Sequence, residues 1–240
     1  MSMITEYDSL LLDLDGSIWE GGRAIDDAVD AIIGAGLPVM YVTNNASRAP
    51  GVVAEQLRGI GLDSATADDV MTSAQAAVIM ASEKIPAGSP GYILGTDSFR
   101  DLARDAGFEV VDSADDRPVA VLHGHNPATG WAQLSEAALS IHNGALYFAS
   151  NLDTTLPMER GLHVGNGSMV AAVVSATGVT PEAAGKPGPA MFFKAAEQLA
   201  SARPLVVGDR LDTDIAGGNA AGMDTFQVLT GVSGHYALLP

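Results

Sequence analysis

The stretch Ser9-Leu10-Leu11-Leu12-Asp13-Leu14-Asp15-Gly16-Ser17 decides the fold of this 240-residue chain. Three consecutive leucines predict a short strand that is buried on both faces, as the strands of parallel sheets are. The strand ends in two carboxylates, Asp13 and Asp15, followed by a glycine. Because ligands bind beyond the carboxyl ends of strands in open α/β sheets, we expect both acids in a functional site. The alternative is an acidic turn that caps a helix, since Asp and Gly are common in turns.

The same pattern of an apolar run that ends in polar residues recurs twice. Residues 38–42 predict a strand that leads into Thr43, and residues 204–208 predict one that leads into Asp209. Lys186 is one of only three lysines and lies between a glycine and a proline. A cation fixed at such a site would offset the charge of a phosphoryl group and relieve repulsion between carboxylates. An ordinary surface lysine is the alternative.

The acids and the hydroxyl suit phosphoryl transfer. Asp13 is the candidate nucleophile, because a carboxylate can form an aspartyl-phosphate and so divide one difficult displacement into two easier ones. Asp15 would protonate the leaving alkoxide and later accept a proton from water. Thr43 could bind a phosphoryl oxygen, or it could merely cap the next helix. Asn44 and Asn45, which follow it, are candidates for orienting the nucleophile or the substrate.

The acids also predict a magnesium site. Mg²⁺ prefers six oxygen ligands and usually takes one or two carboxylates, with water and phosphate completing the set. Asp13, Asp209 and the backbone carbonyl of Asp15 would suit it. Asp214 would lie behind these ligands or bind through a water molecule. Asp212 is interpreted as the N-cap of the following helix.

Strands and helices alternate along the chain, which favours an α/β fold with right-handed crossovers and a parallel sheet. An apolar stripe at Val29, Ile32 and Ile33 predicts the first helix, with Asp26 as its N-cap. We predict a doubly wound, Rossmann-like parallel-sheet core formed by residues 1–73 and 184–240, with an inserted α/β domain formed by residues 74–183. The other predicted strands are 91–94, 119–122, 145–149 and 226–229, and the other predicted helices are one closing at Gly61, 73–84, 99–106, 131–141, 169–176, 189–200 and 214–221.

Composition restricts the class of protein. The net charge is −17, which argues against nucleic acid or an anionic membrane as a partner. A phosphate site in so acidic a chain needs cations of its own, most simply Mg²⁺. We expect a cytoplasmic globular protein, because 47% of residues are hydrophobic, cysteine is absent, and neither a spanning segment nor a secretory signal is visible. Whether the chain is a monomer or a homodimer stays open.

Three other features are interpreted as structural. The glycines around Asn166 faintly resemble a dinucleotide loop but are expected to begin a helix. His123 and His125 have no third metal ligand in view, although they could line a substrate pocket. Trp19 and Trp131 are expected to pack in the interior rather than to stack on a ligand.

Taken in order, the motifs resemble those of the haloacid dehalogenase (HAD) superfamily of phosphohydrolases. The residues concerned are Asp13-Leu14-Asp15-Gly16, Thr43-Asn44-Asn45, Gly185-Lys186-Pro187 and Gly208-Asp209…Thr213-Asp214. The resemblance covers nearly the whole chain and extends to the NagD-like subgroup, which carries a large α/β cap between the second and third motifs. It implies that residues 74–183 are such a cap. Ser17 stands where that subgroup usually has threonine, which keeps a hydroxyl there.

Two cap segments are similar to actinobacterial glycerol-3-phosphate phosphatases: residues 151–161 and residues 165–170. This similarity implies that the chain releases phosphate from glycerol 3-phosphate, a small phosphorylated metabolite. It also makes Asn151, Asp153 and Arg160 candidates for binding the leaving group. The segment His123-Gly124-His125 departs from the pattern usual at that strand end.

Other functions stay open from the sequence. The same chemistry could act on 2-phosphoglycolate, p-nitrophenyl phosphate or nucleotides. Response-regulator receivers also combine an acid cluster, a phosphorylatable Asp, a Thr and a Lys on a parallel sheet, but their lysine comes last and they need only about 120 residues. A catalytically silent phosphate-binding protein is a third alternative, because fold does not determine function. The intact pair of Asp13 and Asp15 argues against it.

Overall fold

A computed structural model of the chain describes residues 3–158 and 160–233. Contacts between residues divide it into two compact units. Unit 1 consists of the described residues within Met1–Thr43, Pro50–Thr72 and Lys186–Pro240, and unit 2 consists of Asn44–Ala49 and the described residues within Ser73–Gly185. The chain therefore passes between units after Thr43, Ala49, Thr72 and Gly185. None of the described helices is long and apolar enough to span a membrane.

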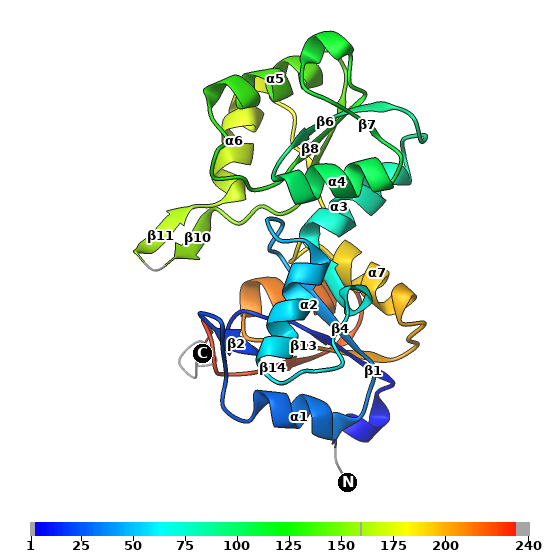
Figure 1. Cartoon of the computed structure of the whole chain (residues 1–240), viewed down its shortest axis with the longest axis vertical. Helices are drawn as coiled ribbons and strands as arrows, with labels where there is room; N and C mark the ends of the chain where they lie inside the picture. The colour runs from blue at the N-terminus through cyan, green and yellow to red at the C-terminus, as the bar shows by residue number, and fades with distance from the viewer. Residues whose placement is uncertain (1–2, 159, 234–240) are drawn as a thin grey trace. The chain divides into compact units, whose positions relative to one another are not determined.

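Unit 1 is built on a parallel five-stranded sheet with the order β14-β13-β1-β4-β5 (Figure 1). All four residues of β1 are buried, as the leucine run predicted. The last strand, β14, begins two residues before the predicted strand 226–229. Strand β5 was not predicted, because it has only three residues and a helix follows it directly. The strands are β1 Ser9–Leu12, β4 Val39–Thr43, β5 Val70–Thr72, β13 Pro204–Gly208 and β14 Asp224–Gln227.

Helices cover this sheet. The first contacts the leucine face of β1 through Val29 and Ile32, whereas Ile33 is 61% exposed, because the helix turns it toward solvent. Asp27, and not Asp26, is the N-cap residue, in a left-handed conformation. The helices of unit 1 are α1 Ala28–Ala35, α2 Pro50–Gly59, α7 Ala190–Gln198 and α8 Ala216–Ala220; the shorter elements are η1 Met3–Glu6, η2 Ala67–Asp69, the π-helical turn η4 Leu211–Ile215, and the hairpin of β2 Trp19–Glu20 and β3 Arg23–Ala24.

The turn after β13 corrects one prediction. Asp212 does not cap a helix, because the N-cap of η4 is Arg210. Its carboxylate instead accepts hydrogen bonds from the guanidinium of Arg210, at 3.0 Å from Nε and 2.8 Å from a terminal nitrogen. Two-thirds of the Asp212 side chain is exposed, so this pair lies at the surface.

Unit 2 contains a second parallel sheet, ordered β12-β9-β8-β6-β7 (Figure 1). The three central strands agree with the prediction within about one residue at each end. The edge strands β7 and β12 were not predicted, since runs of two or three residues give almost no periodic signal. The strands are β6 Pro90–Leu94, β7 Glu109–Val111, β8 Ala120–His123, β9 Leu146–Ala149 and β12 Glu182–Ala183.

Two helices pack on each side of this sheet, α3 with α4 and α5 with α6. A hairpin of β10 and β11, also missed from the sequence, extends from the body of unit 2 (Figure 1). Trp131, at the start of α5, is 84% exposed, so the prediction that it packs in the interior is wrong; Trp19 in unit 1 is buried as predicted. These elements are α3 Ser73–Ser82, α4 Asp97–Asp105, η3 Ala114–Asp116, α5 Trp131–His142, β10 Thr155–Met158, β11 Gly161–Val164 and α6 Asn166–Thr177.

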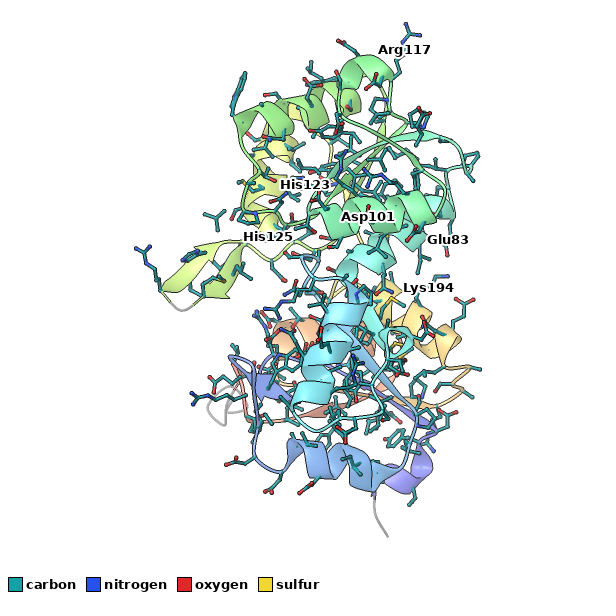
Figure 2. The ribbon with its side chains drawn as sticks, in the orientation of Figure 1. Glu83, Asp101, Arg117, His123, His125 and Lys194 are labelled. Carbon is teal, nitrogen blue, oxygen red and sulfur yellow. The ribbon has the colours of Figure 1, made fainter. Side chains whose placement is uncertain are left out.

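His123 ends β8 inside unit 2 (Figure 2). Its Nδ1 lies 2.9 Å from the hydroxyl of Tyr147 on the neighbouring strand, and only 1% of the residue is exposed. Burial lowers the pKa of His123 from 6.5 to about 3, because the interior disfavours the charged imidazolium. Because it is buried and hydrogen-bonded to Tyr147, His123 does not line an open pocket.

The buried histidine predicts acid sensitivity. As pH falls from about 6.5 toward 3, the unfolded chain binds a proton at His123 that the folded chain excludes, so folding free energy is lost, up to about 5 kcal/mol. His123→Gln should therefore flatten the dependence of the urea midpoint on pH in this range. His142→Gln, which changes an exposed histidine, should leave it as in the wild type. An equal dependence of the urea midpoint on pH in all three proteins would contradict the lowered pKa of His123.

Candidate active site

The predicted site residues of unit 1 meet where three adjacent strands end. Asp13 follows β1, Thr43 is the last residue of β4, and Asp209 follows β13. Those strands are neighbours, with Leu12 paired to Tyr41 on one side and to Val207 on the other. The parallel sheet thus brings residues that are far apart in sequence to one edge. Thr43 is buried there, with 4% of its surface exposed.

Lys186 lies between two of the acids. Its Nζ is 2.5 Å from Asp13 Oδ1 and 2.6 Å from Asp214 Oδ1. It also donates to the backbone carbonyl of Val42 at 3.1 Å. The lysine is buried, so the alternative of a surface lysine is excluded. Asp214, predicted to lie behind the metal ligands, is also buried and contacts this ammonium directly.

Burial and charge shape the ionisation of this cluster. Burial raises the pKa of Asp13 to about 7, and the carboxylates of Asp214 and Asp209 add to this, while Lys186 opposes it. Although burial alone would lower it, the two acids raise the pKa of Lys186 above its usual value, so that the lysine stays charged. Burial also raises the pKa of Asp209. One ammonium thus faces three carboxyl groups, two of them buried and that of Asp13 13% exposed, so the cluster carries more negative than positive charge.

The residues present fit a divalent cation. Asp13, Asp209 and Asp214 each offer a carboxylate oxygen, and the three oxygens lie within 4.8 Å of one another. Asp209 is completely buried, and its Oδ1 has no hydrogen-bond partner among the described residues. An orphaned carboxylate oxygen is costly unless a cation or water binds it. Oxygen donors of this kind are those that Mg²⁺ and Ca²⁺ prefer.

The backbone of residues 230–232 packs closely around the side chain of Asp209. Its Oδ2 accepts a hydrogen bond from the backbone N–H of Val232 at 2.6 Å. A Cβ added to Gly231 would lie 2.1 Å from the same oxygen. The side chain of Thr230 in this loop donates to the carbonyl of Gly16 at 2.7 Å. The loop 230–232 therefore holds Asp209. It was missed from the sequence, where only Gly231, after the last strand, could have indicated it.

Gly16 provides a test of this packing. Its φ is +92°, and an added Cβ would lie 2.8 Å from Asp209 Oδ2. We expect Gly16→Ala to lower the free energy of unfolding by about 2 to 4 kcal/mol, from backbone strain plus the clash. Gly22→Ala is the control, because Gly22 has a φ of +83° but nothing within 4 Å of its Cβ position. It should cost only the strain, about 1 to 2 kcal/mol; equal losses in urea unfolding would contradict the clash.

Asp15 is held apart from the buried cluster. Its Oδ1 accepts a hydrogen bond from the indole N–H of Trp19 at 2.8 Å. The side chain of Asp15 is not part of the three-carboxylate group, so any contact it makes with a metal would come from its backbone. Ser17 donates to the second oxygen of Asp13 at 3.1 Å. Trp19 is thus buried as predicted, but its hydrogen bond to Asp15 was missed.

The other predicted residues belong to unit 2. Asn44 donates from Nδ2 to both carboxylate oxygens of Asp153, at 3.3 and 3.1 Å. Asn151 donates to the backbone carbonyl of Asn44 at 2.8 Å, and Asn45 accepts from the backbone N–H two residues on, at 2.9 Å. Arg160 lies in the turn between β10 and β11 and is exposed. Its neighbour Glu159, in the segment noted above, lies outside the described residues.

Comparison with known proteins identifies the family. A model of haloacid dehalogenase-like hydrolases matches residues 10–109, and a second model of HAD-like hydrolases matches residues 183–239. An acid sugar phosphatase of Staphylococcus aureus is 38% identical over 95% of this chain and 88% of its own length. The chain belongs to the haloacid dehalogenase-like hydrolases. The resemblance seen in the motifs is thereby confirmed.

Other members of the family are similar along most of the chain. D-Glycerol 3-phosphate phosphatase of Mycobacterium tuberculosis is 46% identical over 97% of this chain, which spans 65% of that relative's length. The crystal structure of a glycerol phosphate phosphatase from the same organism, in complex with magnesium, has a TM-score of 0.93 at 46% identity and covers 97% and 70% of the two chains. A p-nitrophenyl phosphatase from Archaeoglobus fulgidus has a TM-score of 0.89 at 28% identity, over 97% and 90%. These structures confirm the predicted α/β fold class.

Proposed function

We propose that the chain is a Mg²⁺-dependent phosphomonoester hydrolase that works through an aspartyl-phosphate on Asp13. The observation that carries this proposal is the group of Asp13, Asp209 and Asp214 around one buried lysine. A protein that only binds phosphate would not need the carboxylate of Asp13 beside the ammonium of Lys186, nor a second acid, Asp15, two residues further on. Residues 1–73 and 184–240 would then be the catalytic core, and residues 74–183 the cap.

Magnesium would be held by Asp13, Asp209 and the backbone carbonyl of Asp15, with Asp214 at or behind this set. When bound, it would supply positive charge to the phosphoryl oxygens and keep the acids ionised. The magnesium complex of the similar phosphatase supports this choice of ion. Lys186 would add a fixed charge on the phosphoryl group. Thr43, buried at the end of β4, would bind a phosphoryl oxygen through its hydroxyl.

The reaction would proceed in two displacements. A carboxylate oxygen of Asp13 forms a bond to phosphorus while the bond from phosphorus to the leaving oxygen breaks, and Asp15 gives its proton to that oxygen. Asp15 then takes a proton from water, which attacks phosphorus, and Asp13 is released with inorganic phosphate. Ser17 holds the non-attacking oxygen of Asp13. Trp19 holds Asp15 in place for both proton transfers.

Glycerol 3-phosphate is the substrate that we propose, because the 46% identity to D-glycerol 3-phosphate phosphatase extends over nearly the whole chain. Acid sugar and p-nitrophenyl phosphatases are also similar, which favours other small phosphoesters as the second candidate. 2-Phosphoglycolate and nucleotides stay alternatives from the sequence. The cytoplasmic location and the choice between monomer and homodimer stay predictions from the sequence as well.

Phosphate release from glycerol 3-phosphate, 2-phosphoglycolate and p-nitrophenyl phosphate, with Mg²⁺ and with EDTA, tests the proposal. We expect turnover with Mg²⁺, none with EDTA, and the highest kcat/KM for glycerol 3-phosphate. Metal-dependent turnover that prefers another ester would keep the mechanism and reject the substrate. Absence of release from all three with Mg²⁺ would reject the proposed function for these substrates, and release that persists in EDTA would reject the metal.

A further inference from the structure

Two of the four places where the chain passes between units adjoin residues of the proposed site. Thr43 is the last residue of unit 1 before the segment Asn44–Ala49, and Lys186 is the first residue after unit 2. The residues on the unit 2 side of these two peptide bonds are Asn44 and Gly185. How unit 2 holds Asn44 and Gly185 therefore limits where Thr43 and Lys186 can lie.

Asn44 is held at both its backbone and its side chain. Its carbonyl oxygen accepts from Ser73 Oγ at 2.7 Å and from Asn151 Nδ2 at 2.8 Å, which fills both lone pairs. Its Nδ2 donates to both oxygens of Asp153. Three side chains, one at the start of α3 and two from the loop after β9, thus converge on one residue.

Gly185 packs closely against Asn44 and Asn151. An added Cβ would lie 2.7 Å from the backbone oxygen of Ser150, 2.8 Å from Asn44 Oδ1 and 2.9 Å from Asn151 Cβ. Only glycine allows this approach, since real Cβ atoms do not come so close to a backbone oxygen. We call Asn44, Ser73, Asn151, Asp153 and Gly185 the Asn44 cluster.

The polar atoms of Asn151 are already used within unit 2. Its Oδ1 accepts from the backbone N–H of Asp153 at 3.2 Å, and its carbonyl accepts from Asn166 Nδ2 at 2.8 Å. Only 5% of Asn151 is exposed. Both N–H donors of its Nδ2 are used as well, by the Asn44 carbonyl at 2.8 Å and by Ser150 Oγ at 3.5 Å, so donating to a leaving group would require it to give up one of these hydrogen bonds. The carboxylate of Asp153 likewise already accepts from Asn44 Nδ2 at both oxygens.

We propose that the Asn44 cluster positions Thr43 and Lys186 through the chain, and that Asn151 and Asp153 are positioning residues rather than ligands of the leaving group. This inference rests on the proposed function, because it takes Thr43 and Lys186 to act on the phosphoryl group. It departs from the assignment that the sequence suggested for Asn151 and Asp153. A shift of about 1 Å in a catalytic group costs on the order of 100-fold in rate, so small changes in the cluster should be visible in kcat.

The test compares two substrates that differ only in leaving group, glycerol 3-phosphate and p-nitrophenyl phosphate. For Ser73→Ala, Asn151→Ala and Asp153→Ala we expect kcat to fall by roughly 10- to 100-fold with both substrates, by the same factor, and KM to change little. Ser73→Ala and Asn151→Ala should be non-additive, because both act on the Asn44 carbonyl. Losses confined to KM for glycerol 3-phosphate, in the Asn151 and Asp153 variants alone, would overturn the proposal.

Ser140→Ala is the matched control. Ser140 is also a fully buried serine of unit 2 whose hydroxyl donates to a backbone carbonyl, that of Glu136 at 2.7 Å, but it lies within α5. It should keep wild-type kcat with both substrates. Equal loss in Ser140→Ala would indicate general destabilisation of unit 2 and overturn the positioning assignment.

Amide hydrogen exchange separates this inference from the proposed function. In Ser73→Ala the amides of residues 43–47 should exchange faster than in the wild type, at an unchanged urea midpoint, and in Ser140→Ala they should not. If the wild type hydrolyses no phosphoester, the proposed function fails, and exchange alone then decides whether the cluster fixes this segment. Unchanged exchange in Ser73→Ala would overturn the positioning role whatever the activity.

Discussion

Asp13→Asn is expected to lower kcat by roughly 10⁴- to 10⁶-fold, because it removes the attacking oxygen and leaves an amide in its place. Losses of this size are typical when a nucleophile is removed while the surrounding site stays intact. The amide has the shape of the carboxylate, and Ser17 and Lys186 remain next to it. The expected loss is therefore chemical rather than structural.

The fold should survive this change. Burial raises the pKa of Asp13 to about 7, so the ionised form is unfavourable in the folded chain, and a neutral amide removes that cost. Lys186 keeps its ion pair with Asp214 at 2.6 Å. We expect a urea midpoint no lower than that of the wild type. Asp212→Asn is the control, since Asp212 is an exposed acid that pairs with Arg210, and it should retain turnover. Full activity in Asp13→Asn would exclude Asp13 as the nucleophile.

Lys186→Met is expected to affect both stability and catalysis. The carboxylates of Asp13, which is largely buried, and of Asp214, which is fully buried, would lose the ammonium that lies within 2.6 Å of each. Breaking a buried ion pair by removing one partner costs about 3 to 5 kcal/mol. Because the lysine charge also stabilises the transferring phosphoryl group, we expect kcat to fall by roughly 100- to 1000-fold in protein that remains folded.

Magnesium and a second lysine separate these two effects. Added Mg²⁺ should restore part of the lost stability, since it supplies positive charge to the same carboxylates. Lys194→Met removes a partly exposed lysine of α7 that pairs with Glu197 at 3.1 Å, and it should change neither quantity by more than a little. A Lys186→Met protein as stable and as active as the wild type would show that these ion pairs contribute neither to stability nor to catalysis.

The central strands and the acid site could be predicted from the sequence because their signals are local. Leu10 to Leu12 form a run that only a strand buried on both faces explains, and Asp13 follows at once. The same pattern before Asp209 placed that acid at the same sheet edge. Lys186 has no such run before it, and it was placed by its flanking glycine and proline and by the order of motifs. The structure brings all three together within one unit.

Other parts could not be predicted because they depend on contacts between distant residues. The edge strand β5 has three residues, and its only signal is its pairing with β4. The loop at Gly231 and Val232 contacts Asp209 only after folding. Asn151 was a candidate ligand because its segment resembles that of glycerol-3-phosphate phosphatases. Its partner, the carbonyl of Asn44, is 107 residues away in sequence.

The most direct test of the account uses Asp15→Asn with p-nitrophenyl phosphate. p-Nitrophenolate leaves without protonation, so the first displacement should still proceed, whereas the second lacks its base. We predict a burst of about one p-nitrophenolate per protein molecule, followed by slow turnover, with a phosphoryl group found on Asp13 by mass spectrometry after acid quenching. Linear release without a burst and with Asp13 unmodified, or a phosphoryl group on another residue, would contradict the account.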